Sequence, residues 1–148
     1  SGVKLLIGYP ISKASTRGGQ CLSVTAHLPG RDKDFSADAF ILATGGLLGG
    51  GLVADHMHIR ETIFAFPVHQ ISNHRNWFHS YSLLKGGHPL DSFGLSVDDY
   101  LRPISSSGRV IMENVFAAGE ILGYYDPYKE KSGGGVALSS GFKAGSLA

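Results

Sequence analysis

The chain has 148 residues, of which 43% are hydrophobic, so it can form one globular domain with a sizeable core but hardly two. Its 13 Lys and Arg residues nearly balance its 12 Asp and Glu residues, which excludes the strong positive charge that binding to nucleic acid or to an anionic membrane needs. The single cysteine, Cys21, excludes an intrachain disulfide and a cysteine-ligated zinc or iron–sulfur centre, and it fits a reducing, cytoplasmic environment.

The first part of the chain predicts β-structure. Residues 3–7 and 20–28 are rich in β-formers, and the polar, glycine-containing segment 16–19 predicts a hairpin between them. Residues 29–32 predict a second turn. Residues 35–44 predict a strand whose continuous apolar end is buried on both faces, as in the parallel sheet of an α/β domain.

A glycine-rich loop follows this strand. Residues 45–51 include five glycines, so their backbone can approach a ligand closely. The apolar stretch 40–54 is too short and too interrupted to span a bilayer, and we expect no insertion into a membrane. Because the sequence opens with Ser1 and Gly2 instead of Met, we expect it to be a piece of a longer protein.

The middle of the chain has little periodicity. Residues 52–108 hold six of the seven histidines and the only tryptophan, and a short strand is expected at residues 62–68. We predict an inserted cap or connecting segment here. His56 and His58 are two possible metal ligands, but a metal site needs a third or fourth ligand around them, so we predict no metal centre.

The last part of the chain returns to regular structure. Residues 110–112 and 114–118 predict strands, and Ser132 is the candidate N-cap of a final helix of small residues. A glycine inside a helix costs about 1 kcal/mol relative to alanine. We therefore expect Gly141 and Gly145 to let another element pack closely against this helix.

Two candidate binding segments follow the buried strands. Thr44, Gly45 and Gly46 lie where ligands bind in α/β sheets, and their N–H groups could reach phosphate or ribose oxygens. The alternative is a tight turn after a core strand. Gly119 is followed by Glu120, whose carboxylate could accept hydrogen bonds from sugar-like hydroxyls. The alternative is a solvated glutamate at the end of a strand.

The third candidate segment opens the final helix. Gly133, Gly134 and Gly135 follow Ser132, and the free N–H groups and positive dipole end of a helix favour an anion. Three glycines would also let a flat ligand come close. The alternative is a flexible loop.

These segments, in this order and spacing, resemble the flavin-binding half of the glutathione-reductase and fumarate-reductase class of flavoproteins. Within that class the chain is most similar to the B subunits of anaerobic glycerol-3-phosphate dehydrogenases, over nearly all 148 residues. It would correspond to roughly the last third of such a protein. The residues behind this closer match are 50–54, 59–61, 93–95, 100–103, 113–116 and 133–136.

The resemblance implies an α/β fold. The chain would be the C-terminal part of a glutathione-reductase-type, Rossmann-like flavin-binding domain. Residues 1–51 would give a β-hairpin or meander, a strand and the glycine-rich loop. Residues 52–108 would form an irregular cap, and residues 109–148 would give a strand, the Gly-Glu pair and the glycine-rich helix. The N-terminal unit that holds the cofactor's pyrophosphate would lie outside the chain.

The resemblance also implies flavin, either FAD or FMN. Thr44, Gly45 and the adjoining Gly46 would lie near the ribose or phosphate of the cofactor. Glu120, preceded by Gly119, would lie near the ribityl or ribose hydroxyls. The first turn of the final helix would lie near the isoalloxazine edge, with these residues: Gly133, Gly134, Gly135 and Val136.

The activity implied is oxidation of glycerol 3-phosphate to dihydroxyacetone phosphate, with electrons passed to quinone. The implied partners are a catalytic flavoprotein subunit and a membrane-associated iron–sulfur subunit, which would keep the chain in the cytoplasm, peripheral to the inner membrane. Alternatives are a fumarate- or succinate-type or other FAD-dependent oxidoreductase, or a non-catalytic assembly subunit that retains the fold.

No catalytic residue is assigned from the sequence. Cationic contacts to a substrate phosphate could come from His56, His58, Arg60 and Arg102. Scattered surface charges in a cap region explain these residues equally well.

Overall fold

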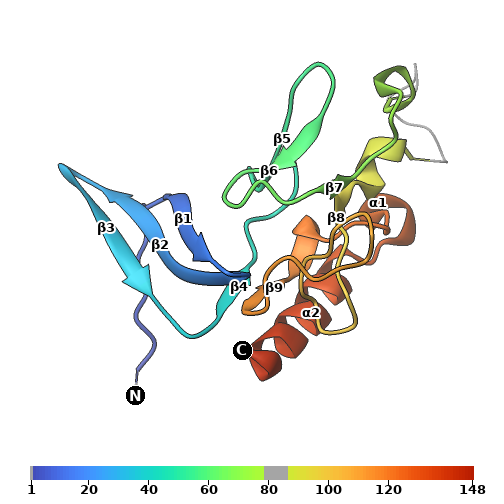
Figure 1. The fold of residues 1–148 in the computed structure, drawn as a ribbon. Helices are drawn as coiled ribbons and strands as arrows, with labels where there is room; N and C mark the ends of the chain where they lie inside the picture. Colours follow the sequence, from blue (N-terminus) through green and yellow to red (C-terminus); the bar gives the residue numbers. More distant parts are fainter. Residues whose placement is uncertain (1, 79–86) are drawn as a thin grey trace.

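The computed structural model describes residues 2–78 and 87–148, in which the strands form four small sheets and the longest helix lies at the C-terminal end (Figure 1). In chain order the elements are β1 (Ile11–Arg17), β2 (Gln20–Leu28), β3 (Arg31–Ser36), β4 (Phe40–Leu42), β5 (Leu52–Ala54), β6 (Ile59–Glu61), β7 (Val68–His69), η1 (His74–Asn76), η2 (Pro89–Ser92), β8 (Gly94–Leu95), β9 (Val115–Ala117), η3 (Gly119–Ile121), α1 (Pro127–Glu130) and α2 (Gly133–Leu147).

The first sheet is an antiparallel meander in the order β1-β2-β3. Gly18 and Gly19 have positive φ angles of 58° and 77°, which make the tight turn between β1 and β2, and Arg17 pairs with Gln20 across it. A two-residue turn pairs the residues that flank it, so the partner of β2 is the segment directly before the turn. The strand predicted at residues 3–7 is therefore wrong, and this segment is exposed and unpaired.

The single strand predicted at residues 35–44 is two strands with different partners. β3 belongs to the meander, whereas β4 pairs in parallel with β9. Asn114 stabilises the break between β3 and β4. Its carboxamide bonds both the N–H and the C=O of Cys21 in β2, and its Nδ2 also donates to the C=O of Asp38. The strand predicted at residues 114–118 is confirmed as β9.

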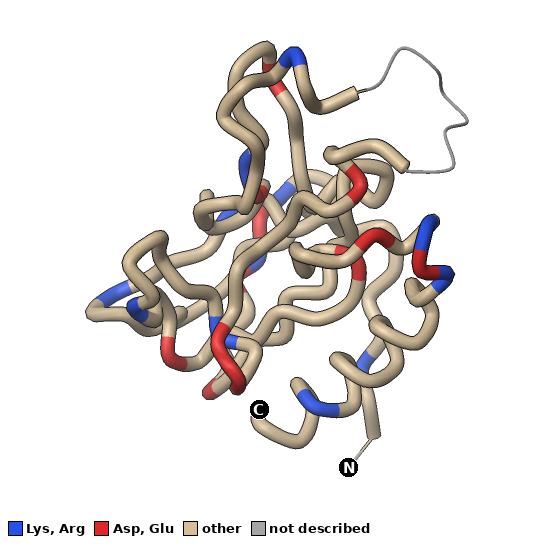
Figure 2. Tube along the Cα trace, turned by 90° about the vertical axis from the view of Figure 1, so that its right-hand side faces the viewer, with Lys and Arg blue, Asp and Glu red and all other residues tan. Residues whose placement is uncertain are grey.

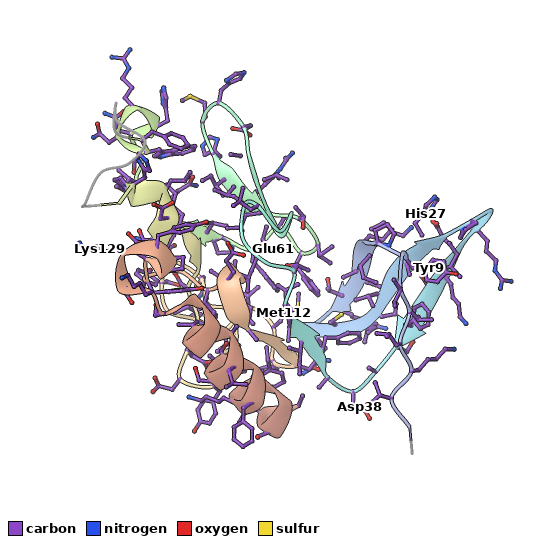
Figure 3. All side chains as sticks on the ribbon, turned by 180° about the vertical axis from the view of Figure 1, so that it is seen from behind. Tyr9, His27, Asp38, Glu61, Met112 and Lys129 are labelled. Atoms are coloured by element: carbon purple, nitrogen blue, oxygen red, sulfur yellow. The ribbon has the colours of Figure 1, made fainter. Side chains whose placement is uncertain are left out.

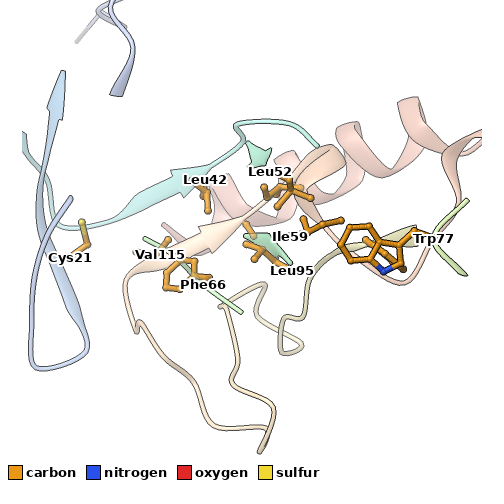
Figure 4. Close-up of a cluster of buried hydrophobic side chains, with 11 residues drawn as sticks. Cys21, Leu42, Leu52, Ile59, Phe66, Trp77, Leu95 and Val115 are labelled. Atoms are coloured by element: carbon orange, nitrogen blue, oxygen red, sulfur yellow. The ribbon is translucent and has the colours of Figure 1, made fainter. Parts of the chain in front are cut away.

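The main core surrounds β4 and β9 and extends toward β5, β6 and β8 (Figure 4). All three residues of β9 are buried. β4 is not buried on both faces as predicted, because its Ile41 is 44% exposed. Its second edge is also open, since no described strand pairs with it. The buried members of the core are Cys21, Leu42, Leu52, Ile59, Phe66, Trp77, Phe93, Leu95, Val115, Ala117 and Ile121.

A buried carboxylate shapes the chain after β6. Glu61 is 1% exposed, and its two oxygens accept hydrogen bonds from the N–H groups of Ile63 and Phe64, at 2.8 and 2.7 Å. These bonds turn the chain, so the strand predicted at residues 62–68 is wrong, and only Val68 lies in a strand. Figure 3 labels Glu61 at the base of the hairpin that β5 and β6 form.

The other short strand predicted from the sequence is also absent. Residues 110–112 contribute only an isolated bridge between Val110 and Ile104. Part of the histidine-rich middle segment, residues 79–86, lies outside the described residues.

The final helix, α2, begins where the sequence predicts, with Ser132 at the N-cap position. The Ser132 hydroxyl does not cap it, however, and instead donates to the carboxylate of Glu130. α2 packs on η3 and β9 through Ser140 and Ala144, its two buried residues. Within residues 2–78 and 87–148, no helix combines the length and the hydropathy required to cross a membrane.

Candidate functional site

The two parallel strands end side by side and bring two of the predicted segments together. Gly45 follows β4 with a φ of 81°, and Gly119 follows β9 with a φ of 78°, a left-handed conformation that favours glycine. The Glu120 side chain lies against the neighbouring Gly46, because a Cβ built there would be 3.2 Å from Glu120 Oε1. Gly45, Gly46, Gly119 and Glu120 therefore share one place in the fold.

The loop after β4 is folded tightly on itself. The carbonyl of Gly46 accepts hydrogen bonds from the N–H groups of Gly51 and Leu52, at 3.1 and 3.2 Å. A Cβ at Gly51 would overlap the carbonyl oxygen of Gly45 and lie 2.6 Å from Thr44 Oγ1. The glycine at position 51 is therefore required for close approach of two backbone segments, and it fixes the shape of the loop beside Glu120.

We expect Gly51→Ala to destabilise this loop. The added methyl would overlap backbone atoms that cannot rotate away, and overpacking of this kind costs about 1–3 kcal/mol. Urea denaturation of the flavin-free protein measures the loss. Gly135→Ala is the matched control, because a Cβ there meets no described atom within 4 Å. Equal free energies of unfolding for the two variants would contradict the prediction.

A cavity of about 170 Å³ opens beside these glycines. Glu120 is exposed, and its carboxylate makes no hydrogen bond within residues 2–78 and 87–148. Tyr125 lies in the same wall. Partial burial raises the pKa of the Tyr125 phenol, and the negative charges of Glu120 and Glu130 raise it further, so the hydroxyl stays a donor. The described lining residues are Gly46, Leu47, Leu48, Leu90, Asp91, Phe93, Glu120, Leu122, Tyr125, Pro127 and Tyr128.

The chemistry of this wall suits hydroxyl groups better than phosphate. Its described polar groups are two carboxylates, Asp91 and Glu120, and two phenols, and none of the residues that line it is Lys, Arg or His. Carboxylates accept hydrogen bonds from hydroxyls but repel phosphate. Small-molecule sites usually enclose about 300–1,000 Å³, so a whole flavin would need more wall than these residues provide. The residues fit the ribityl or ribose portion of a flavin.

The third predicted segment lies next to this cavity but does not line it. A Cβ at Gly133 would be 3.4 Å from Cβ of Pro127, which is in the wall, whereas Gly134 and Gly135 face open space. Ser140 connects the helix to the site, because its hydroxyl accepts the N–H of Gly119 at 2.9 Å and donates to the carbonyl of Val136. Contact between the flavin and Gly133–Val136 stays a prediction.

Thr44 points elsewhere. Its hydroxyl is buried without a hydrogen-bond partner in the described part of the chain. The residue lines a separate apolar groove of about 130 Å³ with residues that include Ile11 and Phe64. A role of Thr44 in binding the cofactor's ribose or phosphate therefore stays a prediction.

Three of the four proposed phosphate contacts lie on the β5–β6 hairpin. Asp55 Oδ1 accepts hydrogen bonds from the N–H groups of Met57 and His58, and these bonds hold the pKa of Asp55 below its ordinary value. The turn leaves His56, His58 and Arg60 exposed, and none of them lines the cavity beside Glu120. These three basic side chains share one hairpin, and their contact with a substrate stays a prediction.

Arg102 lies apart from that group and is bound to two carboxylates. Its Nε and Nη2 donate to Asp98 Oδ2 at 2.9 and 2.7 Å, and its Nη1 donates to Glu113. It lines a different cleft, with residues that include Tyr100 and Phe116. Because most of its donors are already committed, the geometry favours a structural role for Arg102 over phosphate binding.

The Asp98–Arg102 pair predicts a pH dependence of stability. Partial burial opposes ionisation of Asp98, but hydrogen bonds from the Arg102 guanidinium and from the N–H groups of Arg102 and Tyr100 outweigh it, so the pKa of Asp98 is lowered. A lower pKa in the folded state means that the stabilisation is complete above about pH 4 and is lost as pH falls through the folded pKa.

We therefore expect Asp98→Asn to lower Tm at neutral pH and to lower it less as pH approaches about 3. Thermal melts of both proteins across this range measure the difference. Asp99→Asn is the control, because Asp99 is exposed and its carboxylate forms no hydrogen bond within the described chain. A difference in Tm that stays constant with pH would exclude the ion pair as its cause.

Sequence reasoning missed Asp91 and Tyr125 as members of the cavity wall. The sequence does contain a signal for helix α1, which begins directly after Asp126. Asp126 is followed by Pro127, a pattern typical of a helix start, and Asp126 Oδ1 caps α1 by accepting the N–H groups of Tyr128 and Lys129. That pattern predicts α1, but it does not show which side chains α1 brings toward β9.

Comparisons with known proteins give the family of this chain. A family model described as an FAD binding domain matches residues 16–136. The B subunit of the probable anaerobic glycerol-3-phosphate dehydrogenase of Halobacterium salinarum (strain ATCC 29341 / DSM 671 / R1) is 35% identical over 148 residues, which is 100% of this chain and 34% of that protein. The B subunit of the anaerobic glycerol-3-phosphate dehydrogenase of Vibrio cholerae serotype O1 (strain ATCC 39315 / El Tor Inaba N16961) is 37% identical over 114 residues, 77% of this chain and 26% of that protein.

The chain thus spans about a quarter to a third of the length of the curated relatives it matches, from 25% of the Yersinia protein described next to 34% of the Halobacterium protein. A further relative, the B subunit of the same kind of dehydrogenase from Yersinia pestis bv. Antiqua (strain Antiqua), is 36% identical over 109 residues, 74% of this chain and 25% of that protein. No solved structure matches the chain.

Proposed function

This chain belongs to the FAD-binding domain family, and we propose that it forms the part of a flavin site that holds the ribityl or ribose hydroxyls in a B subunit of anaerobic glycerol-3-phosphate dehydrogenase. The family match and the relatives support a flavin-dependent oxidoreductase. The reaction would be oxidation of glycerol 3-phosphate to dihydroxyacetone phosphate, with electrons delivered to quinone.

The free carboxylate of Glu120 is the observation that carries this proposal. It lies against Gly46, in the wall of a cavity, without a hydrogen-bond partner in the described chain. A carboxylate with unused acceptor capacity beside a glycine-rich backbone suits a chain of hydroxyls. Asp91 and the Tyr125 phenol lie in the same wall and would extend this recognition.

The fold supports a division of the site between this chain and the rest of the protein. In our proposal β4 and β9 are two strands of a Rossmann-like parallel sheet, and residues 52–108 form the cap over it. Parallel sheets are normally buried and larger than two strands. The open edge of β4 therefore fits a sheet that continues into the part of the relatives that lies outside this match.

The hydride or electron transfer itself is chemistry that a bound flavin supplies. The residues of this chain would bind and orient the flavin. Glu120 would accept hydroxyl hydrogen bonds, and Gly45 and Gly46 would allow close approach of the ligand. The positive end of α2, at Gly133, would favour negative charge nearby, an effect typically worth about 0.3–1 kcal/mol.

Partners and location follow from the same proposal. The protein would bind a catalytic flavoprotein subunit and a membrane-associated iron–sulfur subunit, and it would sit in the cytoplasm at the periphery of the inner membrane through them. The exposed basic side chains of the β5–β6 hairpin are the groups of this chain that could contact the substrate's phosphate: His56, His58 and Arg60.

One experiment separates this function from its alternatives. The full-length protein is purified with its partner subunits, its bound flavin is identified as FAD or FMN, and dye reduction is followed with glycerol 3-phosphate, succinate or neither. We expect bound flavin and reduction with glycerol 3-phosphate only. Reduction with succinate would favour the fumarate- or succinate-type alternative, and a colourless protein would favour a non-catalytic assembly role.

A further inference from the structure

α2 has an apolar face that no described part of the chain covers. Leu138, Gly141, Phe142 and Gly145 are spaced i, i+3, i+4 and i+7, so they form one stripe along the helix. Leu138 is 78% exposed and Phe142 is 79% exposed. A Cβ added at Gly141 or Gly145 would meet no described atom within 4 Å.

The composition of α2 indicates a helix that is buried on more than one side. Its 15 residues include one charged side chain, Lys143, and the tube in Figure 2 shows how little charge the helix carries. Ser140 and Ala144 already face β9 and η3 on the opposite part of its surface. Its exposed polar residues Ser139, Lys143 and Ser146 fall on one side of the helix, so the stripe lies between this polar side and the packed face and has no polar side chain of its own.

The β4–β9 sheet next to α2 also has an exposed apolar side chain. Ile41 pairs with Phe116, so both side chains lie on one face of the β4–β9 sheet. Phe116 packs in a cluster with Ala144 of α2, whereas Ile41 is 44% exposed. The uncovered surface therefore includes Ile41 on the sheet and the stripe on α2, which lie on the same side of the sheet.

Parallel sheets identify what could cover this surface. Each parallel connection places a helix on one face of the sheet, so a strand added at the open edge of β4 would bring a helix with it. The exposure of Ile41 favours the face that also carries Phe116 and α2. The distance between packed helices depends on the side chains at the contact, and two glycines permit a close approach. Such a strand and helix could come from the rest of a longer polypeptide, because the chain spans only 34% of the length of the Halobacterium relative.

We propose that a helix from the remaining part of the same polypeptide packs on the stripe of α2 and on Ile41. The stripe consists of Leu138, Gly141, Phe142 and Gly145. This inference rests on the proposed Rossmann-like sheet and is independent of flavin binding. It also fits the expectation from the sequence that Gly141 and Gly145 admit a close neighbour, which the described chain does not supply.

Cysteine labelling in the full-length polypeptide tests the proposal. Phe142→Cys on α2 is compared with Ser106→Cys, an exposed control position in a turn far from α2 in the sequence. Both variants react with a maleimide, and mass spectrometry measures the labelled peptide. We expect position 142 to react at least ~10-fold more slowly than position 106 and the two rates to converge in urea. Because Cys21 is 1% exposed, it should stay unlabelled in both native proteins.

The other possible occupants give different outcomes. Protection that appears only after a partner protein is added would assign the face to that partner and overturn the proposal. Protection that depends on protein concentration and accompanies a doubled mass would assign it to a second copy, with the same consequence. Equal labelling rates at positions 106 and 142 would show that the face is bare and would also overturn it.

A second variant covers the case in which Phe142→Cys fails to fold. On a bare helix face Gly145→Ala raises Tm, because alanine favours the helix. If another helix is seated there, the added methyl collides with it, and we expect Tm of the full-length polypeptide to fall. Ser139→Ala, on an exposed part of α2 outside the stripe, is the control and should not lower Tm. A rise in Tm for Gly145→Ala would overturn the proposal.

Discussion

Replacing Glu120 with alanine should lower the flavin affinity of the full-length protein about 10- to 150-fold, because a hydrogen bond to a charged group contributes roughly 1.5–3 kcal/mol. The fold should survive the change. Glu120 is exposed, forms no hydrogen bond within the described chain and is absent from the core clusters. Isothermal titration of flavin into the flavin-free protein measures the affinity.

Two further variants make this test specific. Glu120→Gln should lose less affinity than Glu120→Ala, because the amide oxygen still accepts a hydrogen bond. Asp99→Ala removes a carboxylate that is also exposed but lies outside the cavity wall, and it should leave the affinity unchanged. If Glu120→Ala binds flavin as tightly as Asp99→Ala, Glu120 is only a solvated residue at the end of a strand.

The sequence predicts the elements around Gly46 and Glu120 well because local patterns determine them. The two glycines at positions 18 and 19 define the hairpin turn, and Gly45 and Gly119 end strands in conformations that favour glycine. The apolar run in residues 39–43 and the segment 114–118 predict strands, and the structure pairs β4 and β9 in parallel. The meeting of Gly46 and Glu120 is a consequence of that pairing.

The errors arise where the partner that a segment meets, near or far along the chain, overrides its own local preference. Residues 3–7 have the composition of a strand, but the turn at Gly18 and Gly19 pairs β2 with a closer segment. The strand predicted at 35–44 is divided because Asn114, far along the sequence, bonds both Cys21 and Asp38. No periodicity in a single segment carries such information.

Side chains that reach the site from other elements were also beyond sequence reasoning. Asp91 and Tyr125 line the cavity because η2 packs against α1, the helix that begins two residues after Tyr125. Arg102 was a candidate for phosphate binding from its charge alone, whereas the structure places it between Asp98 and Glu113. Charge and residue type can nominate such residues, but only packing shows which groups they face.

Glu61 illustrates a structural role that composition conceals, and its replacement should have the largest effect on stability. Its side chain is 1% exposed and accepts two backbone hydrogen bonds, from Ile63 and Phe64. Alanine would leave both N–H groups without their acceptor at the partly buried edge of the core. At roughly 1.5–3 kcal/mol for each bond to a charged group, the loss should reach about 3–6 kcal/mol, a large share of the ~5–15 kcal/mol that stabilises a typical domain.

Urea denaturation of the full-length protein measures this loss, and two variants bracket it. Glu61→Gln keeps one acceptor oxygen and presents an NH₂ group to the other N–H, so we expect an intermediate loss. Glu113→Ala removes a carboxylate whose side chain is 55% exposed and which pairs with Arg102, and a surface pair contributes only about 0–1 kcal/mol. If Glu61→Ala loses no more stability than Glu113→Ala, the two backbone bonds do not hold the turn after β6. In that case the packing of Phe64 against Phe66, whose ring centroids are 4.8 Å apart, must define the turn instead.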